Sequence, residues 1–103
     1  MNNVNIIGKL TKKPVLRNAN GQESINTVLS VFNKELNDYD YIMCEEKGAD
    51  AEEFERRLDK GSTVSINGSI RSFKFSKEDG TQVYVTAVRL KEFNVLGSGN
   101  YVH

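Results

Sequence analysis

Residues 61–90 read GSTVSINGSI RSFKFSKEDG TQVYVTAVRL, the pattern of one long β-hairpin. Alternate side chains of a strand share a face. One face of the first arm is apolar and suits a protein core: Val64, Ile66, Gly68 and Ile70. The opposite face should meet water, yet it ends in Arg71, Phe73 and Phe75. This outward face is therefore the first candidate for a binding surface.

The turn of the hairpin is predicted at residues 77–80, Lys-Glu-Asp-Gly, because glycine adopts positive φ without a steric penalty. A loop of these four residues pairs Ser76 with Thr81 and Phe73 with Tyr84. Tyr84 is then expected on the outward face that already holds the two phenylalanines.

Exposed aromatic rings beside a cation are typical of surfaces that bind single-stranded nucleic acid. The rings stack on unpaired bases, and arginine neutralises phosphate or stacks itself. The alternative is that Phe73 and Phe75 lie beneath a loop or against a second subunit. The hairpin pattern by itself leaves both interpretations open.

Length and composition limit the classes of protein to consider. A chain of 103 residues is one domain with a single core. It has no apolar run that could span a membrane and no signal-peptide pattern, so a cytoplasmic protein without a membrane role is expected. One cysteine and one histidine predict neither a disulfide nor a metal site. The sequence shows no catalytic constellation and no glycine-rich phosphate loop, so no catalytic residue, cofactor or enzyme activity is predicted.

A net charge of zero conceals three blocks of opposite sign. Residues 1–34 carry five basic and one acidic side chain, and residues 60–103 carry six basic and three acidic ones. Residues 35–59, between them, carry three basic and ten acidic side chains. The two basic blocks allow an anionic ligand to be held on one side of the protein.

Three more strands are predicted before the hairpin: residues 3–10, 24–33 and 39–45. The first strand ends before Pro14, since proline cannot continue a central strand. Asn20-Gly21 forms a turn before the second strand. The side chains expected to face the core are Ile25, Leu29, Val31, Ile42 and Cys44. Those expected to face outward, a second indication of an aromatic surface, are Val28, Phe32, Tyr39, Tyr41 and Met43.

Residues 50–60 are predicted to form the only helix. Asp50 and Glu53 have the spacing of a capping box, and Gly61 suits a left-handed stop. The apolar stripe of this helix is Ala51, Phe54 and Leu58.

Three strands, a helix and a long hairpin follow one another in the order of an all-β, five-stranded OB-fold barrel. The domain is assigned residues 1–96, and residues 97–103 are expected to form a short flexible C-terminus.

Several of these motifs resemble the OB domain of bacterial and phage single-stranded DNA-binding proteins, the SSB family. The first strand with Gly8-Lys9-Leu10, followed by Pro14 and Arg17, resembles the start of that family. Further matching segments are Asn20-Gly21, Ile42-Met43-Cys44, Lys60-Gly61-Ser62, Ile66 to Arg71 and Gly80 to Thr86. The resemblance covers residues 1–96.

The resemblance implies an OB fold, a homotetramer or a dimer, and a cytoplasmic, nucleoid-associated location. It also implies sequence-independent binding and protection of single-stranded DNA in replication, recombination or repair. Carried over by position, the DNA-stacking aromatics are Tyr41 and Phe75, and the basic contacts are Arg17, Lys60, Arg71 and Lys74. The hairpin pattern adds Phe73 and Tyr84 to this DNA-binding set, and Phe32 or Tyr39 substitutes for an aromatic of the family's longer second loop.

The sequence also departs from the family pattern. Lys47 stands where an aromatic residue is usual, and Glu45 and Glu46 precede it where the family is apolar. These two carboxylates are expected to repel phosphate. The family's acidic C-terminal tail has no counterpart, so recruitment of replication or recombination proteins through such a tail is not expected.

Two alternatives follow from these departures. One is a tailless accessory binder of phage, plasmid or competence type, or a primosomal OB dimer whose main partner is a helicase or another protein. The other is an OB-fold protein-interaction module with weak or no DNA binding. For self-association, Val4 and Ile6 of the first strand are expected to pair or pack across a two-fold axis.

Overall fold

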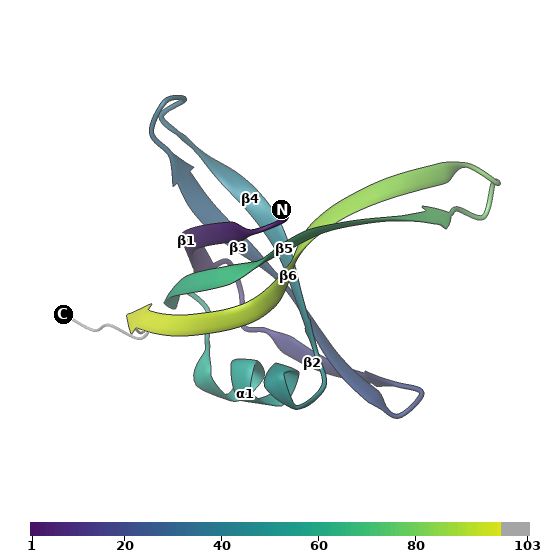
Figure 1. Ribbon diagram of the computed structural model, residues 1–103, viewed down its shortest axis with the longest axis horizontal. Coiled ribbons are helices and arrows are strands. Elements are labelled where there is room, and N and C mark those ends of the chain that lie inside the picture. The colour runs from purple at the N-terminus through teal and green to yellow at the C-terminus, as the bar shows by residue number, and fades with distance from the viewer. Residues whose placement is uncertain (98–103) are drawn as a thin grey trace.

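Alternating apolar and polar residues fold most of residues 1–97, the part of the chain that the computed structural model describes, into strands. In chain order the elements are β1 (Val4–Leu10), β2 (Val15–Ala19), β3 (Gln22–Asn33), β4 (Asp38–Lys47), α1 (Ala49–Arg57), β5 (Thr63–Ser76) and β6 (Gln82–Gly97) (Figure 1). Gly97 ends β6, and the rest of the predicted flexible C-terminus lies outside the described residues.

Five of these strands form a closed ring. The order around the ring is β1-β5-β6-β4-β3, and β3 returns to β1 through the pairs Lys9–Ser30 and Leu10–Leu29. Neighbouring strands are antiparallel except β4 and β6, which run parallel. The closed ring, the helix between β4 and β5 in the chain and the long β5–β6 hairpin agree with the predicted OB fold.

β2 is a strand that the sequence pattern did not indicate. It pairs with β3 outside the ring, from Val15–Asn26 to Ala19–Gln22. The predicted turn between β2 and β3 is confirmed, because Asn20 and Gly21 both have positive φ, 55° and 78°. The residues before that turn therefore widen the sheet beyond the ring.

Two glycines allow the backbones to approach closely where the ring bends. A Cβ atom at Gly8 would lie 2.8 Å from the carbonyl oxygen of Ser30, where β1 passes from β5 to β3. A Cβ atom at Gly68 would collide with the carbonyl of Arg89, next to an irregularity in the β5–β6 pairing. Only a residue without a side chain fits either position while the backbone stays in place.

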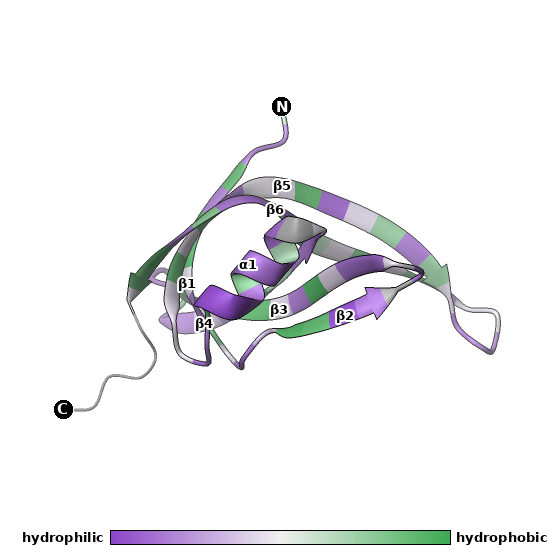
Figure 2. Cartoon of the chain, turned by 90° about the horizontal axis from the view of Figure 1, so that it is seen from below, coloured by the Kyte–Doolittle hydropathy of each residue, from purple (hydrophilic) through white to green (hydrophobic). Residues whose placement is uncertain are grey.

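The core fills the ring and is covered at one end by α1, whose visible residues are mostly hydrophilic in Figure 2. The buried core residues include Leu10, Ile25, Leu29, Cys44, Phe54, Leu58, Val64, Ile66, Val88 and Leu90. Phe54 is fully buried and meets the ring of Phe93 edge-on, with 4.9 Å between ring centroids. The Arg57 guanidinium lies 5.1 Å from the centroid of the Phe93 ring, so a cation–π contact joins α1 to β6.

Ile70 is the exception among the predicted core residues. It is 50% exposed, whereas Val64 and Ile66 on the same arm of the hairpin are buried. Beyond Gly68, β5 no longer pairs with β1, so Ile70 lies at the edge of the core, beside its buried cross-strand partner Val88.

The predicted capping box and helix end are wrong. α1 begins after Gly48 without a side-chain cap, and Asp50 lies within its first turn. The helix ends at Arg57, and Leu58 is extended. Gly61 has a φ of 81°, but it serves the turn into β5, where its N–H donates to the Leu10 carbonyl at 2.8 Å.

The apolar side of β1 faces the core and is partly buried there, while the predicted pairing or packing of this strand across a two-fold axis stays a prediction. Val4 and Ile6 pack against the core of their own chain. Ile7 follows Ile6 directly along the strand, so its side chain lies on the opposite face, where it is exposed.

We expect Phe54→Ala to lower the free energy of unfolding by about 3–5 kcal/mol, because it removes a fully buried ring and leaves a cavity. Phe75→Ala is the matched control, since the same side chain is lost from an exposed position. Thermal and urea unfolding measure both variants. Equal losses of stability in the two variants would show that Phe54 contributes no more to the core than the exposed Phe75 does.

Candidate nucleic-acid interface

The loop of the β5–β6 hairpin decides which side chains share a face. The Lys77 N–H donates to the Thr81 carbonyl at 2.7 Å, so the loop has five residues, 77–81. Phe73 therefore faces Val85, and Tyr84 faces Lys74. The prediction that Tyr84 shares the face of Phe73 is wrong, because a shift of one residue moves a side chain to the other face.

The side chain of Asp79 explains the extra loop residue. Its carboxylate accepts a hydrogen bond from the Thr81 N–H at 2.8 Å, which keeps Thr81 in the loop. The hydrogen bonds from Thr81 also lower the pKa of Asp79.

A groove of about 510 Å³ separates β2, β3 and β4 from the face of the β5–β6 hairpin that carries Phe73 and Phe75. Its apolar lining is Val15, Val28, Met43, Phe73, Phe75 and Val85. The charged side chains that line it are Lys12 and Arg17, and none of the described acidic side chains does. The groove thus combines two accessible aromatic rings with positive charge.

The outward face of β3 and β4 continues the groove. The cross-strand pairs on this face are Val28–Met43, Ser30–Tyr41 and Phe32–Tyr39. Tyr41 is two residues along β4 from Met43, a rise of about 7 Å, and it is exposed. The two aromatic surfaces that the sequence indicated separately therefore form one continuous surface.

The structure brings together only part of the predicted site. Arg17, Phe73 and Phe75 line the groove, and Arg71 lies next to them, on the face of β5 that carries both phenylalanines. Lys74 and Tyr84 form a cross-strand pair on the reverse face of the hairpin, and Tyr84 is 72% exposed. Lys60 lies in the turn after α1, outside the groove lining.

Phe32 and Tyr39 lie at the far end of the same surface. Their rings meet edge-on with 5.3 Å between centroids, at the tip of the β3–β4 hairpin. In Figure 1 this tip points away from the tip of β5–β6. The acidic residues beside the two rings are Glu35, Asp38 and Asp40, and the basic one is Lys34.

Several groove residues were not among the sequence candidates: Lys12, Val15, Val28, Met43 and Val85. The outward direction of Val28 and Met43 was predicted and is confirmed. Val15 and Lys12 line the groove because β2 lies beside β3 and opposite the hairpin, an arrangement that the sequence pattern did not predict.

A comparison with known protein families matches residues 1–96 to the single-strand binding protein family. The chain belongs to this family. A single-stranded DNA-binding protein of Clostridium perfringens is 34% identical over 97% of this chain and 69% of its own length. The values for the Clostridium tetani protein of the same name are 37%, 97% and 73%. A further relative so named, from Lactiplantibacillus plantarum, is 32% identical over 95% of this chain and about half (52%) of its own length.

The acidic pair Glu45–Glu46 of this family member is divided between two faces. Glu46 is only 7% exposed and lies opposite Ile25 on the inner face, next to α1. Its carboxylate accepts the Lys47 N–H at 2.9 Å, and burial raises its pKa. Only Glu45 lies on the outward face, opposite Asn26, so the expected repulsion of phosphate is reduced to one carboxylate.

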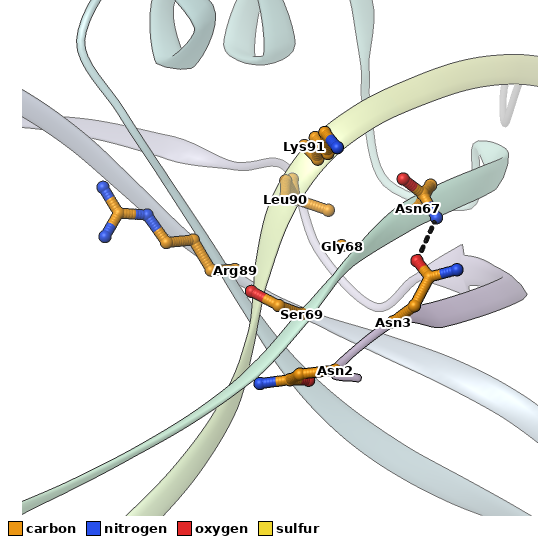
Figure 3. Close-up of a pocket in the computed structure, with 8 residues that line it drawn as sticks. All are labelled: Asn2, Asn3, Asn67, Gly68, Ser69, Arg89, Leu90 and Lys91. Atoms are coloured by element: carbon orange, nitrogen blue, oxygen red, sulfur yellow. Dashed lines mark hydrogen bonds between the residues drawn. The ribbon is translucent and has the colours of Figure 1, made fainter.

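A second cavity, of about 550 Å³, lies where β1, β5 and β6 meet (Figure 3). The Asn67 amide donates to the Asn3 and Asn5 side-chain oxygens at 2.8 and 2.9 Å. The Asn2 amide donates to the Ile70 carbonyl at 2.8 Å and accepts the Ile70 N–H at 2.8 Å, which extends the β1–β5 ladder. Because these amides bond to one another and to the backbone, they hold strands together and the groove is the better candidate for a ligand.

Within residues 1–97, no helix has the length and apolar character needed to cross a membrane. No group of three or more His, Cys, Asp or Glu side chains in that part could hold a metal ion.

We expect Glu46→Gln to raise the melting temperature at about pH 7 and to leave it unchanged at about pH 4. Burial raises the pKa of Glu46 above its ordinary value of 4.5, so the folded protein holds this proton more tightly than the unfolded chain does. The resulting stability is complete below pH 4.5 and is lost as the pH rises through the raised pKa. Glutamine stays neutral and can still accept the Lys47 N–H.

Glu45→Gln is the control for this prediction, because Glu45 lies on the outward face. Melting temperatures of both variants and of the unchanged protein are measured across the same pH series. If the two variants had the same pH dependence, burial of Glu46 would not be the cause.

Proposed function

We propose that this protein binds single-stranded DNA without sequence preference and protects it during replication, recombination or repair. The observation that carries the proposal is the groove, which places Phe73 and Phe75 next to Arg17 and Lys12. Family membership and the names of the relatives support the same ligand. The proposed role is binding, with no catalytic step.

In the proposed mechanism, bases stack on Phe73, Phe75 and Tyr41. Every base has a flat aromatic face, so stacking does not distinguish one sequence from another. Arg17, Lys12 and Arg71 neutralise phosphates along the same path. Duplex DNA keeps its bases stacked inside the helix and offers the rings nothing to bind, so it is bound more weakly.

The remaining predicted contacts belong to a longer strand path. Lys60, Lys74 and Tyr84 are exposed but lie outside the groove, so they reach DNA only where a strand leaves the groove and follows the outer surface. We assign them a smaller share of the affinity than the groove residues.

We further propose that the protein works as a homotetramer or a dimer, in the cytoplasm at the nucleoid. β1 pairs with β3 only at Lys9 and Leu10, so its edge from Val4 to Gly8 faces no other strand within residues 1–97 on that side. An unpaired edge is a surface where a second copy can add a strand. Light scattering at micromolar concentration tests this, and the mass of a single chain would contradict it.

Phe75→Ala is expected to weaken binding of a labelled oligo(dT) by about 5- to 150-fold, the loss of about 1–3 kcal/mol typical of one stacked base. Tyr84→Ala is the matched control, since it removes an exposed aromatic from the same hairpin on the reverse face. Fluorescence anisotropy measures both, and circular dichroism confirms that both fold. A larger loss of affinity in Tyr84→Ala than in Phe75→Ala would mean that bases stack on the reverse face of the hairpin, which contradicts the proposal.

The salt dependence of oligo(dT) binding is an independent test of the proposed phosphate contacts. The affinity for oligo(dT) should fall as the salt concentration rises, because cations of the protein displace counterions from phosphates. Arg17→Ala should reduce this salt dependence, whereas Lys60→Ala should change it little. Absence of oligo(dT) binding at low salt would favour an OB-fold protein-interaction module instead.

A further inference from the structure

The tip of the β3–β4 hairpin is an exposed apolar surface with acidic residues around it. We name residues 32–40 the knob. Its exposed apolar side chains are Phe32, Leu36 and Tyr39. Its charged side chains are Lys34, Glu35, Asp38 and Asp40, a net charge of −2. Exposed apolar patches that are rimmed by polar residues commonly mark interaction sites.

The knob is well ordered by its own hydrogen bonds. The Leu36 N–H donates to the Asn33 side-chain oxygen at 3.2 Å, and the Asn33 amide donates to the Asp40 carboxylate at 3.1 Å. The Tyr39 N–H donates to the Asp38 carboxylate at 2.7 Å. A surface that is already ordered loses little conformational entropy when it docks.

The carboxylates make the knob a poor partner for DNA and a good partner for the groove. A phosphate backbone would meet three acidic side chains next to the two rings, and like charges repel. The groove instead offers an apolar lining with Lys12 and Arg17. Aromatic rings with flanking negative charge are also the features of single-stranded DNA that the groove is proposed to bind.

The knob cannot reach the groove of its own chain. Phe32 and Val28 lie on the same outward face of β3, four residues apart, which fixes them about 13 Å from each other. The same arrangement permits two copies to meet. A two-fold axis in the plane between two such faces, level with Ser30 and Tyr41, places each knob over the groove of the other copy.

We propose that the knob of one copy docks in the groove of a second copy, so that self-association and single-stranded DNA compete for the groove. The docking contact depends on charge and apolar complementarity alone. The competition with DNA rests on the function proposed above.

Disulfide trapping tests the contact directly. Leu36→Cys on the knob and Val15→Cys at the groove are made in separate chains, mixed and exposed to a mild oxidant, and both groove cations stay in place. The natural Cys44 stays silent, since it is buried and burial raises the pKa of its thiol to about 12. We expect a crosslinked pair that contains one chain of each variant.

Thr86→Cys is the matched control for the groove cysteine. It also replaces an exposed β-branched side chain, but on the reverse face of the hairpin, and it should give no crosslink with Leu36→Cys. Adding Glu35→Gln and Asp38→Asn to the Leu36→Cys chain should slow crosslinking to Val15→Cys by about tenfold or more, because opposite charge speeds association. Equal crosslinking of Val15→Cys and Thr86→Cys, or none with either, overturns the docking proposal.

Oligo(dT) separates this proposal from the proposed function. If both hold, oligo(dT) suppresses the crosslink between Leu36→Cys and Val15→Cys. If the crosslink forms and oligo(dT) neither binds the unchanged protein nor suppresses it, docking stands and the DNA function fails. If oligo(dT) binds and no crosslink forms, the DNA function stands and docking fails.

The variant Phe32→Ser with Tyr39→Ser distinguishes a protein contact from a DNA contact at the knob. At protein concentrations where copies associate, it should bind oligo(dT) more tightly, because the competing knob is lost. Weaker binding would mean that Phe32 and Tyr39 stack on bases, which overturns the docking proposal.

Discussion

The close crossing of β1 and β3 at Gly8 makes the ring possible. Lys9 pairs with Thr63 of β5 and with Ser30 of β3, so one short strand joins both sides of the sheet. A side chain at Gly8 would hold the two backbones apart. Without this contact the sheet would stay open, and the buried residues under α1 would lose the wall that excludes water.

The proposed binding surface exists because the strands β3 to β6 are longer than the closed ring requires. Their ends continue outward as two-stranded arms, and residues 71–80 are exposed throughout (Figure 1). Apolar side chains on these arms have no core behind them, so Phe73 and Phe75 stay accessible. A two-stranded arm is marginally stable by itself. One wall of the groove can therefore adjust to a ligand at little energetic cost, while the β3–β4 wall is held by the ring.

The alternation of residues predicted most of the fold and part of the candidate site. It placed Ile25 and Leu29 inward and Phe32 and Tyr41 outward, as observed. The same parity, continued from Cys44, assigns Glu46 to the inner face, a signal that the sequence held. The position of Tyr84 could not be predicted, because one hydrogen bond from Thr81 to Asp79 sets the loop length. Nor could the presence of Val15 in the same groove as Phe75, which depends on how segments far apart in the sequence come together.

A net charge of zero suits a protein with both an anion-binding groove and a complementary acidic knob. Copies without net charge do not repel one another at long range, so local patches decide how they meet. Salt screens the contact between knob and groove as it screens any pair of opposite charges. It weakens DNA binding more steeply, because a polyanion also releases condensed counterions when it is bound. Low salt therefore favours DNA in the groove, and rising salt shifts the competition toward the knob of a second copy.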